Sequence, residues 1–217
     1  MVAIARRALD TKKIGHCGTL DPMATGLLML VVGRATKIQD LLMSEDKCYR
    51  GQMMLGVSTS SQDREGTVTQ ERAVPDLTQE QIIEAFDRYV GDFEQLPPMV
   101  SAIKVQGVPL YKMARKGQEI ERKMRPVKVM RYEIESVALP EVSFEVECSK
   151  GFYVRTYAHD IGESLGCGAH LSALRRTRSG KFNLDRAVTV DDLKQLPREH
   201  LLTSLISLAE ISLMRGL

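Results

Sequence analysis

Runs of alternating or β-branched apolar residues predict the strands of this chain. They occur at 28–32, 49–55, 127–139 and 142–148. The last two ranges flank Pro140, and this arrangement predicts an antiparallel hairpin.

Apolar residues at helical spacing predict the helices. Thr78 and Gln81 form a capping-box pattern before an apolar face that ends at Gly91, which predicts a helix over 79–90. The same criteria predict helices over 110–116, 156–165, 170–176, 190–196 and 198–209. Helices and hairpins in this order predict an α+β fold on a mixed, largely antiparallel sheet.

Composition narrows the class of protein. A chain of 217 residues with 43% hydrophobic residues is long enough to bury a core. The longest apolar run, 27–32, is far shorter than the roughly 20 residues of a membrane-spanning helix, and the first ten residues do not resemble a signal peptide. We therefore expect a soluble, cytoplasmic protein with no membrane partner.

Cysteines and histidines show no metal-binding spacing. The four cysteines lie far apart without a CxxC pair, and the four histidines add no zinc pattern to them. The sequence predicts reduced thiols, no metal and no cofactor.

Charge alone does not indicate a nucleic-acid partner. The net charge is +2 and the pI is about 8.3, so a positively charged surface for nucleic acid must come from local clusters of Lys and Arg. Such clusters occur at 6–7, 12–13, 122–131 and 175–178. They are either solvated surface charge or contacts to phosphate.

The segment 15–26, GHCGTLDPMATG, has neither helical nor strand periodicity. Its glycines and Pro22 predict a shaped loop that displays Asp21 on a rigid turn. Such display suits a catalytic carboxylate. The alternative is an ordinary Asp-Pro turn in which Asp21 only bonds its own backbone.

Four blocks of sequence resemble the TruB family of tRNA pseudouridine synthases. They are GHCGTLDPMATG, DKCYRGQMMLG (46–56), PPMVSAIKVQGVPLYKMARKG (97–117) and CSKGFYVRTYAHDIGESLGCGAHLSALRRTRSG (148–180). The resemblance spans nearly the whole chain. It implies a pseudouridine synthase fold over 1–217, isomerisation of the T-arm loop uridine of tRNA (U55), and a monomer that needs no obligatory protein partner.

The resemblance also assigns catalytic roles. Asp21 matches the catalytic acid, which serves either as a nucleophile or as the base that opens a glycal route. Arg155 matches the arginine that orients this acid through charge-assisted hydrogen bonds. Tyr49 matches the tyrosine that stacks on the flipped base, and its hydroxyl could also remove the C5 proton.

Further positions match RNA contacts of the family. Tyr153 and Leu174 correspond to the wall of the base pocket, His16 to a histidine that enters the RNA loop, and Asp63 to an acid that aids base flipping. Lys104 approaches either the acid or a phosphate. Basic residues around the pocket are expected to hold the RNA backbone: Arg115, Lys116, Arg175 and Arg176. For Leu174 and Tyr49 the alternative role is ordinary packing. For Lys104 the alternative is an exposed, solvated side chain.

The sequence departs from the family pattern at three places. Ser60 stands where the family commonly has an acid; the chain opens at the helix that normally follows a Lys-Pro-x-Gly-x-Ser/Thr strand; and it stops before the C-terminal PUA domain that many members carry. The expected consequences are an unpaired sheet edge and weaker tRNA affinity.

Two other functions are compatible with these residues. One is a non-catalytic module that binds and folds tRNA, and the other is the guide-RNA-dependent relative that shares the catalytic core. A pure binder needs no rigidly displayed Asp21 together with Arg155 and Tyr49, and the guided relative relies on protein partners. The sequence therefore favours the tRNA-modifying enzyme.

Overall fold

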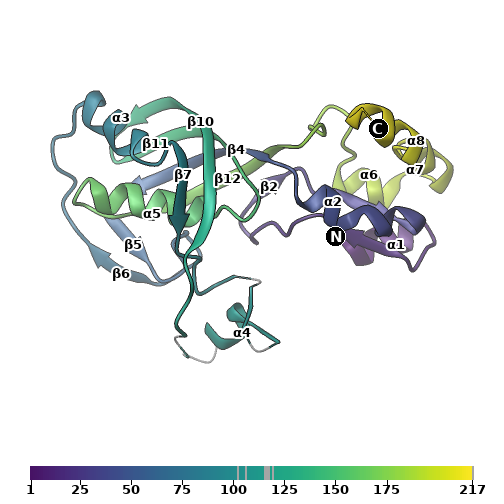
Figure 1. Cartoon of the computed structure of the whole chain (residues 1–217), viewed down its shortest axis with the longest axis horizontal. Helices are drawn as coiled ribbons and strands as arrows, with labels where there is room; N and C mark the ends of the chain where they lie inside the picture. The colour runs from purple at the N-terminus through teal and green to yellow at the C-terminus, as the bar shows by residue number, and fades with distance from the viewer. Residues whose placement is uncertain (102, 106, 115–117, 119, 217) are drawn as a thin grey trace. The chain divides into compact units, whose positions relative to one another are not determined.

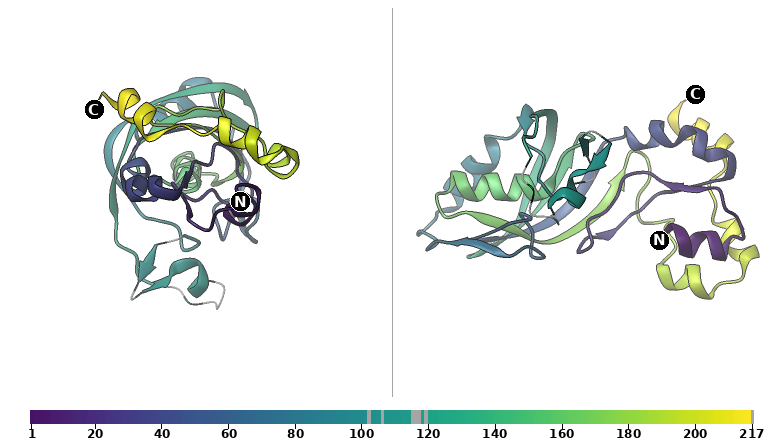
Figure 2. Two further views of the ribbon diagram at one scale, coloured as in Figure 1. Left: turned by 90° about the vertical axis from the view of Figure 1, so that its right-hand side faces the viewer. Right: turned by 90° about the horizontal axis from the view of Figure 1, so that it is seen from below.

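The computed structural model describes the chain except residues 102, 106, 115–117, 119 and 217, and it leaves the side chains at 104, 105, 109, 111 and 112 undescribed. The chain divides into two compact units (Figures 1 and 2). Unit 1 comprises Met1–Lys47 and Arg176–Leu217, and unit 2 comprises Cys48–Arg175. Strands β4 (Lys47–Leu55) and β12 (Ala169–Ser179) cross the boundary between them.

Unit 2 is built on a sheet with the order β12-β4-β11-β10-β7. Strand β10 (Arg125–Ala138) pairs antiparallel with both β11 (Glu141–Cys148) and β7 (Gly91–Gln95). The turn between β10 and β11 contains Pro140, so the predicted hairpin is confirmed.

The core of unit 2 lies where two helices contact this sheet. Helix α3 (Gln79–Asp87) begins with the predicted capping box of Thr78 and Gln81, and α5 is Val154–Ser164. Phe86 of α3 and Tyr157 of α5 pack edge-to-face with a centroid separation of 5.6 Å, and both contact Phe144 of β11. Alternate residues of β11 are fully buried, as the period of two requires.

Two smaller hairpins complete unit 2. Strands β5 (Val57–Thr59) and β6 (Val68–Glu71) pair antiparallel, as do β8 (Lys104–Val105) and β9 (Val108–Pro109). The second hairpin leads directly into α4 (Leu110–Ala114).

Unit 1 combines both ends of the chain. Its N-terminal part contains α1 (Val2–Ala8), β1 (Ile14–His16), β2 (Thr25–Gly26), β3 (Leu30–Val32), the 3-10 helix η1 (Gly33–Ile38) and α2 (Gln39–Met43). Its C-terminal part contains α6 (Val190–Gln195), α7 (Arg198–Thr203) and α8 (Leu208–Arg215). Strands β1 and β3 pair antiparallel, and β2 lies next to β12.

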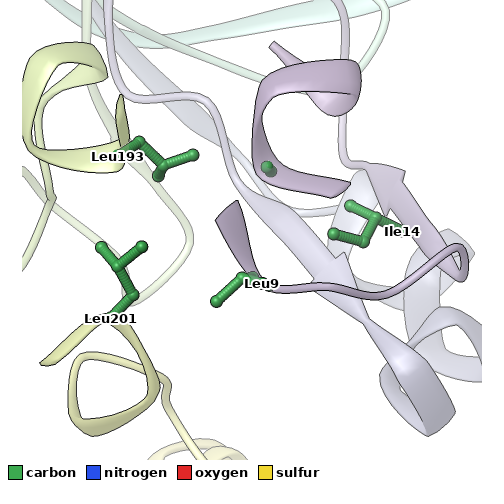
Figure 3. Close-up of a cluster of buried hydrophobic side chains, with 5 residues drawn as sticks. Leu9, Ile14, Leu193 and Leu201 are labelled. Carbon is green, nitrogen blue, oxygen red and sulfur yellow. The ribbon is translucent and has the colours of Figure 1, made fainter. Parts of the chain in front are cut away.

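A hydrophobic cluster joins the two parts of unit 1. Figure 3 shows Leu9 and Ile14 facing Leu193 and Leu201, and Ala5 completes the buried set. Helix α8 is held by ion pairs of Arg215 with Glu45 and of Arg186 with Glu210. Burial of apolar side chains from both ends therefore stabilises this unit.

Two predicted helices are wrong. The range 170–176 lies in β12. Its leucines span too few residues to distinguish the period of a helix from that of a strand, and pairing with neighbouring strands decides the conformation. The range 198–209 divides into α7 and α8, since the Ser207 hydroxyl accepts the Glu210 amide (3.1 Å) and starts a second helix.

Within the part of the chain that the structure describes, every helix is too short or too polar to cross a membrane.

Candidate active site

Asp21 occupies the first position of a tight turn. Its carbonyl accepts the Ala24 amide at 2.9 Å, and Pro22 follows it at the second position. Proline there presets φ, and Asp is favoured at the first position. The half-buried Asp21 is thus part of a shaped loop, as its sequence predicted.

Both ends of this segment, residues 18–27, contact Arg176 within unit 1. The Arg176 guanidinium donates from Nε to the Leu27 carbonyl (2.7 Å) and from Nη2 to the Gly18 carbonyl (3.2 Å). The side chain is almost wholly buried, with 2% of the residue exposed. This placement differs from the expected phosphate contact, because a buried guanidinium bonded to carbonyls has little surface to offer RNA.

Cys17 immediately precedes this loop and is buried. Burial raises the pKa of the Cys17 thiol, and the positive charges of Lys47 and Arg176 partly oppose that rise. The thiol is therefore neutral near pH 7 and a weak nucleophile.

His16 ends strand β1 rather than lying in a free loop. It is paired opposite Leu30, and its carbonyl accepts a hydrogen bond from Gln39 Nε2 at 3.1 Å. The backbone is therefore fixed, whereas the buried Nδ1 of the ring has no hydrogen-bond partner among the described residues.

Arg155 and Asp63 meet in unit 2. Arg155 lies in the first turn of α5, and its Nε is 3.6 Å from Asp63 Oδ2, with side chains only 2% and 5% exposed. Its two terminal nitrogens donate to the carbonyls of Ser61 and Val100, each at 2.8 Å. These contacts fix the plane of the guanidinium.

Asp63 is itself held by its own loop. Its Oδ1 accepts hydrogen bonds from the Ser61 hydroxyl (2.5 Å) and from the Glu65 amide (3.0 Å). Gln62, with φ of 63°, accepts a hydrogen bond from the Thr156 hydroxyl at 2.8 Å. The Asp63 loop is therefore docked onto α5, the helix that carries Arg155.

Tyr153 precedes α5 and is held by Gln95 of β7. The Gln95 carboxamide donates to the Tyr153 carbonyl (3.1 Å) and accepts the Tyr153 amide (2.8 Å). Gln95 is 2% exposed. Sequence reasoning missed Gln95, Ser61 and Gln62, because a polar residue on a strand or in a turn normally indicates exposure.

The remaining candidates are distributed over several elements. Tyr49 is half-buried on β4, Leu174 is buried on β12, and Arg175 is exposed on β12. Lys104 lies in β8, but its side chain is not described, and Arg115 and Lys116 fall outside the described residues. The described residues contain no cluster of His, Cys, Asp and Glu that could hold a metal ion.

The candidates divide between the two units. His16, Asp21 and Arg176 belong to unit 1. Tyr49, Asp63, Tyr153, Arg155, Leu174 and Arg175 belong to unit 2.

Solved structures of similar fold include chains of multi-component complexes. The chain superposes with a TM-score of 0.68 and 32% identity on a chain of "Crystal Structure of a Cbf5-Nop10-Gar1 Complex", covering 88% of this chain and 48% of that one. A second match, "Structure of H/ACA RNP bound to a substrate RNA containing 2'-deoxyuridine", has a TM-score of 0.67 and 27% identity, covering 95% of this chain and 51% of that one. The chain thus spans about half the length of these neighbours.

Curated relatives are more similar. The tRNA pseudouridine synthase B of Opitutus terrae is 53% identical over 197 residues, which are 91% of this chain and 82% of the relative. That of Syntrophotalea carbinolica is 44% identical over 97% of this chain and 69% of the relative. That of Geobacter sulfurreducens is 48% identical over 90% of this chain and 64% of the relative.

Two family models match consecutive parts of the chain. Residues 6–154 match the TruB family pseudouridylate synthase (N terminal domain), and residues 155–213 match the tRNA pseudouridylate synthase B C-terminal domain. The α+β fold expected from the sequence agrees with the structural neighbours. The chain therefore belongs to the TruB family of pseudouridylate synthases, an isomerase family.

Proposed function

We propose that this chain isomerises the T-loop uridine of tRNA (U55) to pseudouridine with Asp21 as its catalytic carboxylate. The observation that carries the proposal is the match of residues 6–154, which contain Asp21, to the TruB family, and the hydrogen bond from Ala24 to the Asp21 carbonyl fixes the backbone beneath the carboxylate. A catalytic group must be held within a narrow range of positions, and a tight turn restricts its motion.

The reaction breaks the bond between ribose C1′ and base N1, turns the base over, and joins C5 to the same sugar carbon; C5 then loses its proton and N1 gains one. Asp21 acts either as the nucleophile or as the base that removes a ribose proton. In this proposal Arg155 is the arginine of the catalytic machinery that the family resemblance implies. Its buried contacts with Asp63, Ser61 and Val100 support the role, because they fix the guanidinium before substrate arrives.

We assign capture of the extruded base to aromatic and apolar side chains. Tyr49 supplies a stacking face, and Tyr153 and Leu174 line the pocket around the base. His16 enters the RNA loop. The paired strand position of His16 and the hydrogen bond from Gln39 to its carbonyl support this role, because they fix the backbone that carries the ring.

Recognition is proposed to follow the shape of the stem and loop, with phosphate contacts supplying most of the affinity. Arg175 is exposed and suits such a contact, and Lys104, Arg115 and Lys116 are retained as candidates. We treat 1–217 as one catalytic domain that acts on tRNA in the cytoplasm as a monomer, with neither a cofactor nor an obligatory protein partner.

The decisive experiment is incubation of the purified chain with an unmodified T-arm transcript, followed by chemical mapping of pseudouridine. The parent should modify U55 alone among the uridines of the transcript, and Asp21→Asn should not, although it should bind the transcript as well as the parent does. Binding by the parent without any pseudouridine would instead assign the chain to non-catalytic tRNA folding. Full activity of Asp21→Asn would remove Asp21 from catalysis.

A further inference from the structure

We propose that Arg176 is a positioning residue, which holds both ends of the 18–27 loop and thereby fixes the carboxylate of Asp21. The inference rests on the proposed function for its catalytic consequence. The structural part of it concerns unit 1 alone, since the loop and Arg176 belong to the same unit.

Arg176 bridges two points of the loop that are nine residues apart. Its Nε bonds the Leu27 carbonyl and its Nη2 bonds the Gly18 carbonyl, at 2.7 and 3.2 Å. The backbone adds a third contact, because the Arg176 carbonyl accepts the Leu27 amide at 2.8 Å. A guanidinium is a planar fork with several donors, so one side chain can bond two carbonyls in a fixed geometry.

The loop approaches Arg176 too closely to allow a side chain at residue 26. Gly26 has φ of +92°, and a Cβ added there would lie 2.2 Å from the Arg176 carbonyl oxygen. Glycine permits both this torsion and this approach. The end of the loop is therefore packed directly on the backbone of residue 176.

The neighbouring arginine provides the contrast. Arg175 is exposed, whereas Arg176 is 2% exposed, as expected for successive residues of a strand. Contact with phosphate requires an accessible cation. Of these two candidates for the RNA backbone, only Arg175 has the exposure for that contact, and the contacts of Arg176 point to the loop.

Loss of the Arg176 contacts with the loop should lower the rate of the chemical step more than the affinity for RNA. If the loop relaxes, Asp21 shifts from its productive position, and misplacement by about 1 Å can cost about 100-fold in rate. Affinity for RNA should change less than about twofold, because Arg176 presents no surface to phosphate.

The test compares Arg176→Lys, which keeps the charge but replaces the planar fork of donors by a single nitrogen, with Arg176→Met, which keeps only the apolar stem. Arg186→Lys is the matched control, since it makes the same change at an exposed arginine of unit 1 paired with Glu210. For each full-length protein we would measure amide hydrogen exchange over 18–27, single-turnover pseudouridine formation, and T-arm affinity as a function of salt.

The proposal predicts faster exchange over 18–27 and a rate lowered by about 10- to 100-fold, with the Met variant more affected than the Lys variant. Affinity, salt dependence and the control should match the parent. Weaker binding with a flatter salt dependence and normal exchange would make Arg176 a phosphate contact and overturn the proposal. A looser loop with an unchanged rate would overturn its positioning role.

Two features keep the test decisive. If Arg176→Met shows no cooperative unfolding transition, it is not folded like the parent. The Lys variant alone then tests the proposal, with the same expected and contradicting outcomes. If the parent forms no pseudouridine, the proposed function fails, but exchange over 18–27 still shows whether Arg176 holds the loop.

Discussion

Arg155 and Asp63 form a buried ion pair, and each of them also makes hydrogen bonds to other groups. Arg155 bonds the carbonyls of Ser61 and Val100, and Asp63 accepts from the Ser61 hydroxyl and the Glu65 amide. Removing one partner of such a pair leaves an uncompensated buried charge.

We therefore predict that Asp63→Ala destabilises the protein by about 3–5 kcal/mol, measured by urea denaturation. Glu65→Gln is the control, because its carboxylate pairs with Arg64 on the surface and such pairs contribute about 0–1 kcal/mol. Equal small effects of the two substitutions would contradict a structural role for the buried pair.

The second prediction separates the two roles given to Tyr49. Tyr49→Phe keeps the stacking face and removes the hydroxyl, so a rate loss of about 10²- to 10⁴-fold with normal affinity would assign proton transfer at C5 to the hydroxyl. Tyr49→Leu should reduce both rate and capture of the flipped base, measured by stopped-flow fluorescence of a 2-aminopurine beside the target. Parent-like behaviour of both variants would exclude Tyr49 from the pocket.

The third prediction concerns phosphate contacts. T-arm affinity should fall steeply with salt, and Arg175→Ala should reduce the log-log slope by about 0.7–0.9, the value for one phosphate. Lys194→Ala is the control, because Lys194 already pairs with Asp191 at 3.2 Å. Equal slopes for parent and Arg175→Ala would remove Arg175 from the RNA contact surface.

The fourth prediction is a pH dependence of stability that originates at Asp160 in α5. Burial raises the pKa of Asp160 to about 6 from its ordinary 3.8, with Glu163 adding to the rise and His159 opposing it. The folded state therefore binds this proton more tightly than the unfolded state, and the free energy of unfolding should fall as pH rises from about 4 to about 6.

Asp160→Asn should abolish that part of the fall, so its stability relative to the parent should increase across this window. Urea midpoints at several pH values would measure it. Asp76→Asn, an exposed loop substitution, is the control. The same pH dependence in parent and Asp160→Asn would show that Asp160 does not titrate differently on folding.

Elements with strong local signals were predictable from the sequence. The capping box of Thr78 and Gln81 located the start of α3, and alternation around Pro140 located the β10–β11 hairpin. Strand β12 was not predictable, because its pairing with β2 and β4 comes from parts of the chain far away in sequence. Sequence periodicity cannot report such pairing.

Residue types located the candidate site, but their contacts required the structure. The sequence indicated Asp21 through its loop and Arg155 through its motif, and it placed Arg176 with the surface cations. Only the fold shows that Arg176 is buried against carbonyls and that Gln95 holds the backbone of Tyr153. Hydrogen bonds from a side chain to backbone groups far away in sequence leave no periodic trace.

The hydrophobic cluster of unit 1 has a consequence for biosynthesis. Ala5, Leu9 and Ile14 are translated well before Leu193 and Leu201, which bury them. Unit 2 is continuous in sequence and can fold on the ribosome while these early residues still expose apolar surface. The N-terminal segment therefore remains a potential chaperone-binding stretch until residue 201 has left the exit tunnel.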